Sequence, residues 1–259
     1  RLKAFGKYVL RGERREGARY LMTHSFQKMQ LEILDNCDVF LPNAKTEMDQ
    51  IAAHLGFRTD NYVVVPNAVD VASIKAAKEV ESTGYERFSG WIVCIGRIDI
   101  RKNQLNLIKA VEGSDYKVVF VGKKSPGHIE YANKVVSEIE ANPNMEWIEQ
   151  IPNEDIYKLC RECRVSVLPS WFETPGLVSL EAAAMGCNIV VSPKGTTRDY
   201  FGDSAFYCDV SSPSSIRAAL DEAYGVNYDE VFGRKVITEY TWEKAAEKTL
   251  DGYQLALKG

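Results

Sequence analysis

Residues 165–192 read VSVLPSWFETPGLVSLEAAAMGCNIVVS, and this stretch contains the repeating unit of the expected fold. It opens with a short apolar run, VSVLPS (165–170), and closes with another, NIVVS (188–192). Between them, GLVSLEAAAMG (176–186) is typical of a helix that ends at Gly186, because leucine and alanine favour helices and glycine favours their C-terminal caps. Two short strands joined by a single helix predict a βαβ unit with parallel strands.

The same alternation continues on both sides of this stretch. Single helical patterns separate short apolar runs, and such an arrangement predicts a parallel sheet covered by helices on both faces. The expected fold class is therefore α/β, a doubly wound Rossmann-like parallel sheet that binds ligands at the carboxyl ends of its strands. Further strands are expected at 91–96, 116–122, 145–149 and 205–209, with helices at 104–113, 128–142, 153–163 and 212–225.

Residues 1–65 follow a different pattern. They contain a basic opening (1–17), a helical segment, a short strand at 38–41, a helix at about 44–55 and a strand at 62–66. These are at most two βα units, too few for a second complete doubly wound domain. PNAVD (66–70) is typical of a connector, because proline and asparagine favour turns. The charged stretch 75–90 indicates surface or loop.

The composition narrows the class of protein. A net charge of −4 argues against a nucleic-acid partner, because nucleic-acid binders usually carry a basic face. No stretch approaches the ~20 apolar residues of a membrane span, and no signal-peptide pattern opens the chain. The six cysteines and three scattered histidines lack the spacing of a metal site, so no metal is expected. The cysteines are interpreted as reduced thiols, which favours a cytoplasmic protein.

Two cations follow the expected strand at 91–96. Arg97 stands directly after that strand, and Lys102 lies near the start of the next helix. Two cations beside the free N–H groups of a helix start can clamp a diphosphate. The alternative is a pair of solvated surface charges. A P-loop is excluded, because the glycines of FVGKKSPG (120–127) have the required spacing but no lysine and serine or threonine follow them.

Two glutamates, Glu173 and Glu181, surround the expected helix start at 176–178. Unpaired N–H groups there can bind a phosphate oxygen or a sugar hydroxyl, and Glu181 could accept hydrogen bonds from two vicinal hydroxyls. Taken singly, the glutamates could be an ordinary cap-region acid and a solvated helix residue, since chance supplies about one such pair per chain. Together with Arg97 and Lys102 they predict a site with cations for a diphosphate and acids for sugar hydroxyls.

Several motifs in this order resemble the family 4 retaining glycosyltransferases, which have the GT-B fold. GRIDIRKN (96–103) resembles that family's glycine-arginine…lysine motif, and FETPGLVSLEAAAMGCNIVVS (172–192) resembles its E-x7-E signature. VVVPNAVD (63–70) is similar to the family's interdomain segment, and YTWEKAAEKTLDGYQLAL (240–257) to its terminal helix. The likeness covers residues 36–256.

The resemblance implies a domain organisation. The chain would be the C-terminal, donor-binding half of a GT-B enzyme, with a remnant of the N-terminal acceptor domain at 1–65 and a nucleotide-sugar-binding domain at 66–240. A C-terminal helix at 241–259 would pack back toward the N-terminal domain. The glycine-rich loop and the histidine that family members bring from that domain have no candidate in this chain.

The resemblance also implies roles for single residues. Arg97 and Lys102 would bind the diphosphate, Glu173 would hold hydroxyls of the donor sugar, and Glu181 would bind the ribose hydroxyls. The family often has an aromatic residue and a glycine after the first glutamate, and the change to threonine and proline here is interpreted as a tolerated variant. The other expected donor contacts are Gln150 and Ile151 at the base, and Thr174, Pro175, Gly176, Leu177 and Val178 after the first glutamate.

The implied reaction moves a hexose from a UDP- or GDP-linked sugar to a hydroxyl, with retention of configuration and without a metal or other cofactor. The implied acceptor is a carbohydrate or a lipid-linked molecule in polysaccharide or glycoconjugate synthesis, which is compatible with peripheral membrane association of the full-length enzyme. This chain alone is expected to bind nucleotide but to turn over poorly. Two alternatives stay open: a non-catalytic nucleotide-sugar-binding module, and a GT-B relative such as a sugar epimerase or a phosphorylase.

Overall fold

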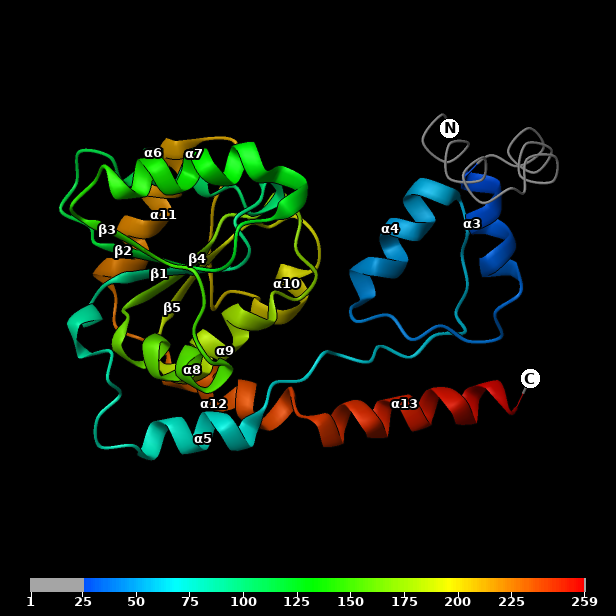
Figure 1. The fold of residues 1–259 in the computed structure, drawn as a ribbon. Helices are drawn as coiled ribbons and strands as arrows, with labels where there is room; N and C mark the ends of the chain where they lie inside the picture. Colours follow the sequence, from blue (N-terminus) through cyan, green and yellow to red (C-terminus); the bar gives the residue numbers. More distant parts are fainter. Residues whose placement is uncertain (1–25, 259) are drawn as a thin grey trace.

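The computed structural model describes residues 26–258, and Figure 1 shows one parallel sheet between layers of helices, with α3 (Phe26–Asp35), α4 (Lys45–Leu55) and α13 (Trp242–Ala256) beside it. The strands lie in the order β3-β2-β1-β4-β5-β6, and each neighbouring pair is parallel. This is the expected doubly wound Rossmann-like sheet, so the predicted fold class is confirmed. The strands are β1 (Ile92–Ile95), β2 (Val118–Val121), β3 (Met145–Ile148), β4 (Val165–Leu168), β5 (Asn188–Val191) and β6 (Phe206–Tyr207).

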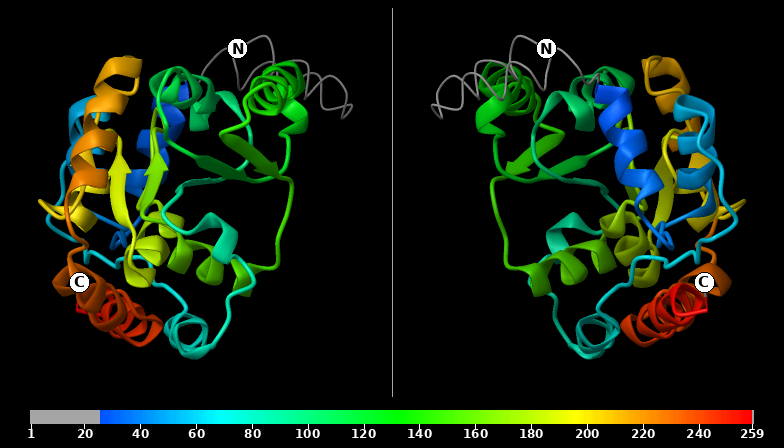
Figure 2. Two further views of the ribbon diagram at one scale, coloured as in Figure 1. Left: turned by 90° about the vertical axis from the view of Figure 1, so that its left-hand side faces the viewer. Right: turned by 90° about the vertical axis from the view of Figure 1, so that its right-hand side faces the viewer.

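Helices cover both faces of the sheet. Alternate residues of a strand point to opposite faces, so Val93 and Ile95 pack into one apolar cluster while Ile92 and Cys94 pack into the other. Figures 1 and 2 show the two helical layers on either side of the sheet. One layer contains α6 (Gln104–Val111), α7 (Ile129–Glu140) and α11 (Pro213–Gly225), and the other contains α5 (Val71–Glu79), α8 (Asn153–Glu162), α9 (Leu177–Met185), α10 (Thr197–Phe201) and α12 (Glu230–Glu239).

Three helices, α5, α10 and α12, were not expected from the sequence. α5 occupies the beginning of a stretch for which the charged residues predict surface or loop. It begins at Asp70, whose carboxylate accepts the Ser73 N–H at 3.0 Å, and it buries only Ile74 and Ala77. α12 follows Asp229, whose carboxylate accepts the N–H groups of Val231 and Phe232. With so few buried side chains in α5, the apolar pattern is too sparse to reveal the helix.

The N-terminal segment contains α3 (Phe26–Asp35) and α4 (Lys45–Leu55). The two strands expected at 38–41 and 62–66 are only extended segments, joined by a single parallel bridge between Phe40 and Tyr62. Backbone hydrogen bonds to the carbonyls of Phe40 and Pro42 continue this pairing for a few residues. Within residues 26–258, no third segment pairs with these two. The basic opening at 1–17 lies outside the described residues.

The terminal helix α13 (Trp242–Ala256) runs along the N-terminal segment (Figure 1). Its residue Gly252 lies against Leu41 so closely that an added Cβ would be 2.3 Å from the leucine Cδ2 atom. The terminal helix thus contacts the N-terminal segment at Leu41. The expected division into 1–65, 66–240 and 241–259, with a terminal helix that packs toward an N-terminal domain, stays a prediction. Within residues 26–258, no helix combines the length and the apolar character needed to cross a membrane.

Candidate functional site

The expected site lies between β1 and β4, where the strand order of the sheet reverses. β1 and β2 are paired over four residues, but β1 and β4 only at Ile92–Val165 and Val93–Ser166. β1 and β4 therefore separate toward their carboxyl ends. Doubly wound sheets bind ligands at such a switch point, and the loops 96–103 and 169–176 meet there.

The loop after β1 is shaped by two side chains. Asp99 accepts the Lys102 N–H at 3.1 Å and begins a short 3-10 helix, η2 (Ile100–Lys102). Asn103 follows in the left-handed region, at φ 60°, and its side-chain amide donates to the carbonyls of Pro169 (3.1 Å) and Val210 (2.8 Å). Asparagine tolerates this conformation better than most residues do. Together the two side chains fix Lys102 beside the loop that follows β4.

Lys102 and Glu173 form the centre of the site. The lysine Nζ lies 2.7 Å from Glu173 Oε2, and the two side chains are only 12% and 10% exposed. Arg101 approaches the other carboxylate oxygen at 3.5 Å and donates to the Phe172 carbonyl at 3.1 Å. The structure thus brings together two of the predicted residues and adds a third, Arg101. In this state the carboxylate neutralises cations that a diphosphate would otherwise meet.

The backbone of Glu173 is held by the loop after β5. Its carbonyl accepts the Thr196 N–H at 3.0 Å, and its N–H donates to the Lys194 carbonyl at 3.3 Å. Between these residues stands Gly195, with φ +96°. A Cβ added there would lie 1.9 Å from the Glu173 carbonyl oxygen, so only glycine permits this approach. The position of Glu173 therefore depends on β5 as well as on β4.

The start of α9 offers free N–H donors next to Glu173. Gly176 is the N-cap in the left-handed region, at φ 65°, and has no side chain with which to cap the helix. Its carbonyl accepts the N–H groups of Ser179 and Leu180. The N–H groups of Leu177 and Val178 have no acceptor among the described residues. Such donors, aligned with the helix dipole, suit an anionic ligand.

Glu181 lies in the second turn of α9 and contacts a different helix. Its Oε1 accepts the hydroxyl of Tyr157, which lies on α8, at 3.2 Å. Burial raises the pKa of Glu181 above its usual value, the hydrogen bond from Tyr157 opposes that rise, and the nearby Asp70 carboxylate adds to it. Glu181 is therefore a held, half-buried acid rather than a solvated helix residue.

The other predicted residues lie around this centre without joining it. The exposed Arg97 places its Nε 4.0 Å from Asp99, and within the described chain it pairs with neither glutamate. Gln150 is exposed after β3, while Ile151 packs half-buried against the apolar cluster. Thr174 is exposed and Pro175 is buried. The sequence prediction missed Arg101 and Tyr157. Arg101 could have been predicted from its position next to Lys102 in GRIDIRKN.

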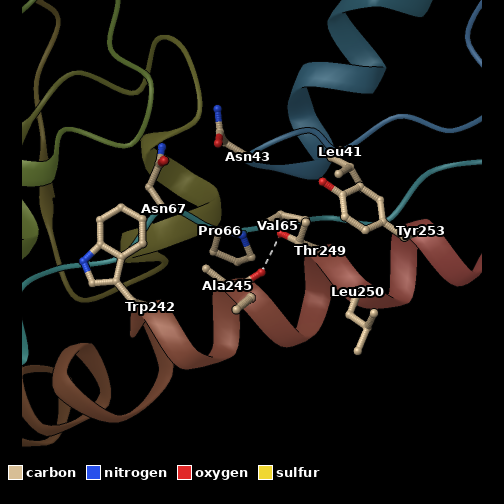
Figure 3. A pocket seen from close by; sticks show the side chains of 11 residues that line it. Leu41, Asn43, Val65, Pro66, Asn67, Trp242, Ala245, Thr249, Leu250 and Tyr253 are labelled. Carbon is tan, nitrogen blue, oxygen red and sulfur yellow. Dashed lines mark hydrogen bonds between the residues drawn. The ribbon is translucent and has the colours of Figure 1, made fainter.

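A second concave surface lies elsewhere and has a different chemistry. A groove of about 490 Å³ separates α13 from the residues around Leu41 and Pro66 (Figure 3). Figure 3 shows Trp242 and Tyr253 along it, and all of its lining side chains are uncharged. A diphosphate needs cations, so the strand ends suit it and this groove does not. Within residues 26–258, no three His, Cys, Asp or Glu side chains are arranged to hold a metal ion.

Comparisons with known proteins converge on one family. A family model described as "Glycosyl transferases group 1" matches residues 86–227. A D-inositol 3-phosphate glycosyltransferase of Paenarthrobacter aurescens is 25% identical over 243 residues, which cover 88% of this chain and 60% of that protein. The chain spans about half to three fifths of the length of the curated relatives it matches first, namely 60%, 57% and 48% of the three.

Solved structures share the fold at lower identity. A glycosyltransferase from Rickettsia africae ESF-5 superposes with a TM-score of 0.74 at 14% identity, over 85% of this chain and 64% of the other. A sucrose-phosphate synthase from Thermosynechococcus elongatus gives a TM-score of 0.72 at 18% identity, over 92% and 63%. At such identities the likeness concerns the fold.

Proposed function

The chain belongs to the glycosyl transferases group 1 family, and from this premise we propose that its β1–β4 site binds a nucleotide-diphosphate sugar as donor. The donor would be UDP- or GDP-linked, and its hexose would pass to a hydroxyl of a carbohydrate or lipid-linked acceptor with retention of configuration. The observation that carries the proposal is the Lys102–Glu173 ion pair at the switch point of the sheet, beside the free N–H groups at the start of α9.

The diphosphate is assigned to the cations and the helix start. Lys102 Nζ would leave Glu173 Oε2 for a phosphate oxygen, and the N–H groups of Leu177 and Val178 would bind another. Arg97 is exposed at the end of β1 and can turn toward the same anion. These groups would neutralise the charge that develops on the leaving diphosphate, which is the work that a metal ion does in other enzymes.

The two glutamates are assigned to different parts of the donor. Glu173 would accept hydrogen bonds from hydroxyls of the hexose, since its carboxylate lies in the crevice and keeps its contact with Arg101 when Lys102 turns to the phosphate. Glu173 is therefore assigned to orient the sugar rather than to attack it. Glu181 would bind the ribose hydroxyls. The backbone of Gln150 and Ile151 would contact the base, and Thr174, Pro175 and Gly176 would shape the wall beside the phosphates.

The whole protein is assigned by extension. Residues 1–65 would be the end of an acceptor-binding domain, 66–240 the donor domain and 241–259 the helix that joins the two. The proposed role is polysaccharide or glycoconjugate synthesis by a cytoplasmic enzyme that associates peripherally with a membrane.

Binding measurements test the proposal. We expect UDP-glucose or GDP-mannose to bind the 259-residue chain in isothermal titration calorimetry, and Lys102→Met to weaken that binding about 10- to 100-fold, because a charge-assisted hydrogen bond contributes about 1.5–3 kcal/mol. Lys45→Met is the matched control, since it removes a lysine from an exposed ion pair with Asp49 on α4. Equal affinities in the two variants would refute the phosphate assignment.

A further inference from the structure

We infer that Tyr157 is a positioning residue for the donor nucleotide: its hydroxyl holds one oxygen of Glu181 so that the carboxylate is set to read both ribose hydroxyls. The inference rests on the proposed function, in which Glu181 binds the ribose. Ribose recognition would then depend on a residue of α8 as well as on the motif residues of α9.

In the part of the chain that the structure describes, Tyr157 holds one oxygen of the Glu181 carboxylate and leaves the other free. Tyr157 is 7% exposed, its ring packs in the apolar cluster beneath the sheet, and its hydroxyl donates to Glu181 Oε1 at 3.2 Å. Within the described chain, Glu181 Oε2 has no hydrogen-bond partner and remains free for a ligand. A glutamate side chain has several rotatable bonds. Because one oxygen is already fixed against a helix, less side-chain entropy is lost when the ligand binds.

The described groups around Glu181 leave its negative charge uncompensated. The groups that face it are Tyr157 on α8 and Asp70 at the start of α5. Burial and the Glu181 charge both raise the pKa of Tyr157, so its phenol stays protonated and acts only as a donor. Among the described residues no lysine or arginine pairs with Glu181, whereas Glu173 contacts two cations. A neutral partner orients the carboxylate and leaves its full charge for hydroxyl donors.

A second tyrosine provides a matched control. Tyr85 donates to Asp155 Oδ2 at 3.1 Å, which is the same kind of contact on the other flank of α8. Tyr157→Phe and Tyr85→Phe each remove one hydroxyl and keep the ring, so packing is preserved in both. Only the first variant touches the proposed ribose site.

The experiment compares ribose and deoxyribose ligands. The dissociation constants of UDP-glucose, GDP-mannose and their 2′-deoxyribose counterparts are measured by calorimetry at about pH 7. We expect the wild type to prefer the ribose ligand about 10-fold or more, Tyr157→Phe to lower this preference about 3- to 10-fold with little change for the deoxy ligand, and Tyr85→Phe to behave as the wild type.

The pH dependence of ribose-ligand affinity distinguishes a positioning role of Tyr157 from a purely structural one. Loss of the Tyr157 donor raises the pKa of Glu181 further, so the affinity of Tyr157→Phe for the ribose ligand should decline at a higher pH than that of the wild type as the solution is acidified. A chain with 3-fluorotyrosine at position 157 has a stronger hydroxyl donor, and its decline should move to lower pH. This second variant keeps the test valid if Tyr157→Phe does not fold.

The outcomes separate the two hypotheses. A wild-type chain that binds both ligands equally would refute the ribose assignment of Glu181, and the role of Tyr157 with it. A wild-type chain that prefers ribose, with the same preference and the same pH profile in Tyr157→Phe, would refute the role of Tyr157 alone.

Discussion

Replacement of Glu173 by glutamine removes one charge from the centre of the site and keeps the shape of the side chain. Lys102 Nζ and Arg101 Nη1 lie 2.7 Å and 3.5 Å from its carboxylate oxygens. At an effective dielectric constant of about 20, these distances correspond to gross attractions of about 6 and 5 kcal/mol, most of which desolvation offsets. Breaking a buried pair costs about 3–5 kcal/mol.

The expected cost for Glu173→Gln is smaller than that. The amide oxygen of glutamine still accepts a hydrogen bond from Lys102, and Arg101 is partly exposed. We expect a loss of about 1–3 kcal/mol of unfolding free energy, which lowers the Tm by about 2–10 °C. Glu146→Gln is the control, because it removes the carboxylate of a surface ion pair with Arg87, whose net contribution is about 0–1 kcal/mol.

The same variant should separate two ligands. A free nucleoside diphosphate no longer competes with the Glu173 carboxylate for Lys102, so its affinity should rise about 10-fold. A nucleotide sugar gains the same freedom, but its sugar hydroxyls meet a neutral amide with one acceptor oxygen in place of a charged carboxylate with two, so its affinity should fall about 10-fold. Calorimetry with UDP and UDP-glucose, or GDP and GDP-mannose, measures both. If the affinities of the two ligands change by the same factor in the same direction, Glu173 does not bind the sugar, and its assignment to the hexose hydroxyls is refuted.

Three further variants test other parts of the site. Gly195→Ala should cost at least about 2 kcal/mol of unfolding free energy and weaken nucleotide-sugar binding, because its Cβ meets the Glu173 carbonyl. Gly127→Ala has open space around its Cβ and should leave both properties unchanged. Thermal unfolding measures the stability of the two variants, and calorimetry measures their binding. Arg97→Ala should weaken nucleoside-diphosphate binding about 10- to 100-fold and change stability by less than about 0.5 kcal/mol; unchanged affinity would remove Arg97 from the clamp. Glu181→Gln should raise the Tm near pH 7, because the pKa of Glu181 is raised in the folded state and its ionisation therefore opposes folding. The gain in Tm should vanish near about pH 4, where the carboxyl is protonated in the folded state. A lower Tm of the variant near pH 7 would contradict the assigned burial of Glu181.

The sheet is predictable from the sequence because its strands are buried on both faces. Every residue of β1, β2, β4 and β5 is buried. β1 and β2 are continuous apolar runs, and β4 and β5 contain one polar residue each, Ser166 and Asn188, so none of the four shows the regular polar alternation of a surface strand. α5 and α12 are not predictable in this way. They depend on capping by Asp70 and Asp229 and on packing against helices that are distant in the sequence.

The site is predictable in composition but not in contacts. Placing Lys102 and Glu173 at adjacent strand ends follows from the topology, but their direct ion pair depends on the 3-10 turn after Asp99 and on the close approach at Gly195. That turn presents Arg101 to Glu173 and leaves Arg97 outside. The contact between Tyr157 and Glu181 was equally hidden, since an aromatic residue at helical spacing indicates core packing and carries no sign of its hydroxyl's partner.

A crystal structure of the chain with UDP-glucose or GDP-mannose would show where the donor binds. We predict that the nucleotide lies at the carboxyl ends of β1 and β4, with phosphate oxygens on Lys102 Nζ and on the N–H groups of Leu177 and Val178, and with the ribose hydroxyls on Glu181. A nucleotide bound in the uncharged groove beside α13, or a diphosphate remote from Lys102, would contradict it.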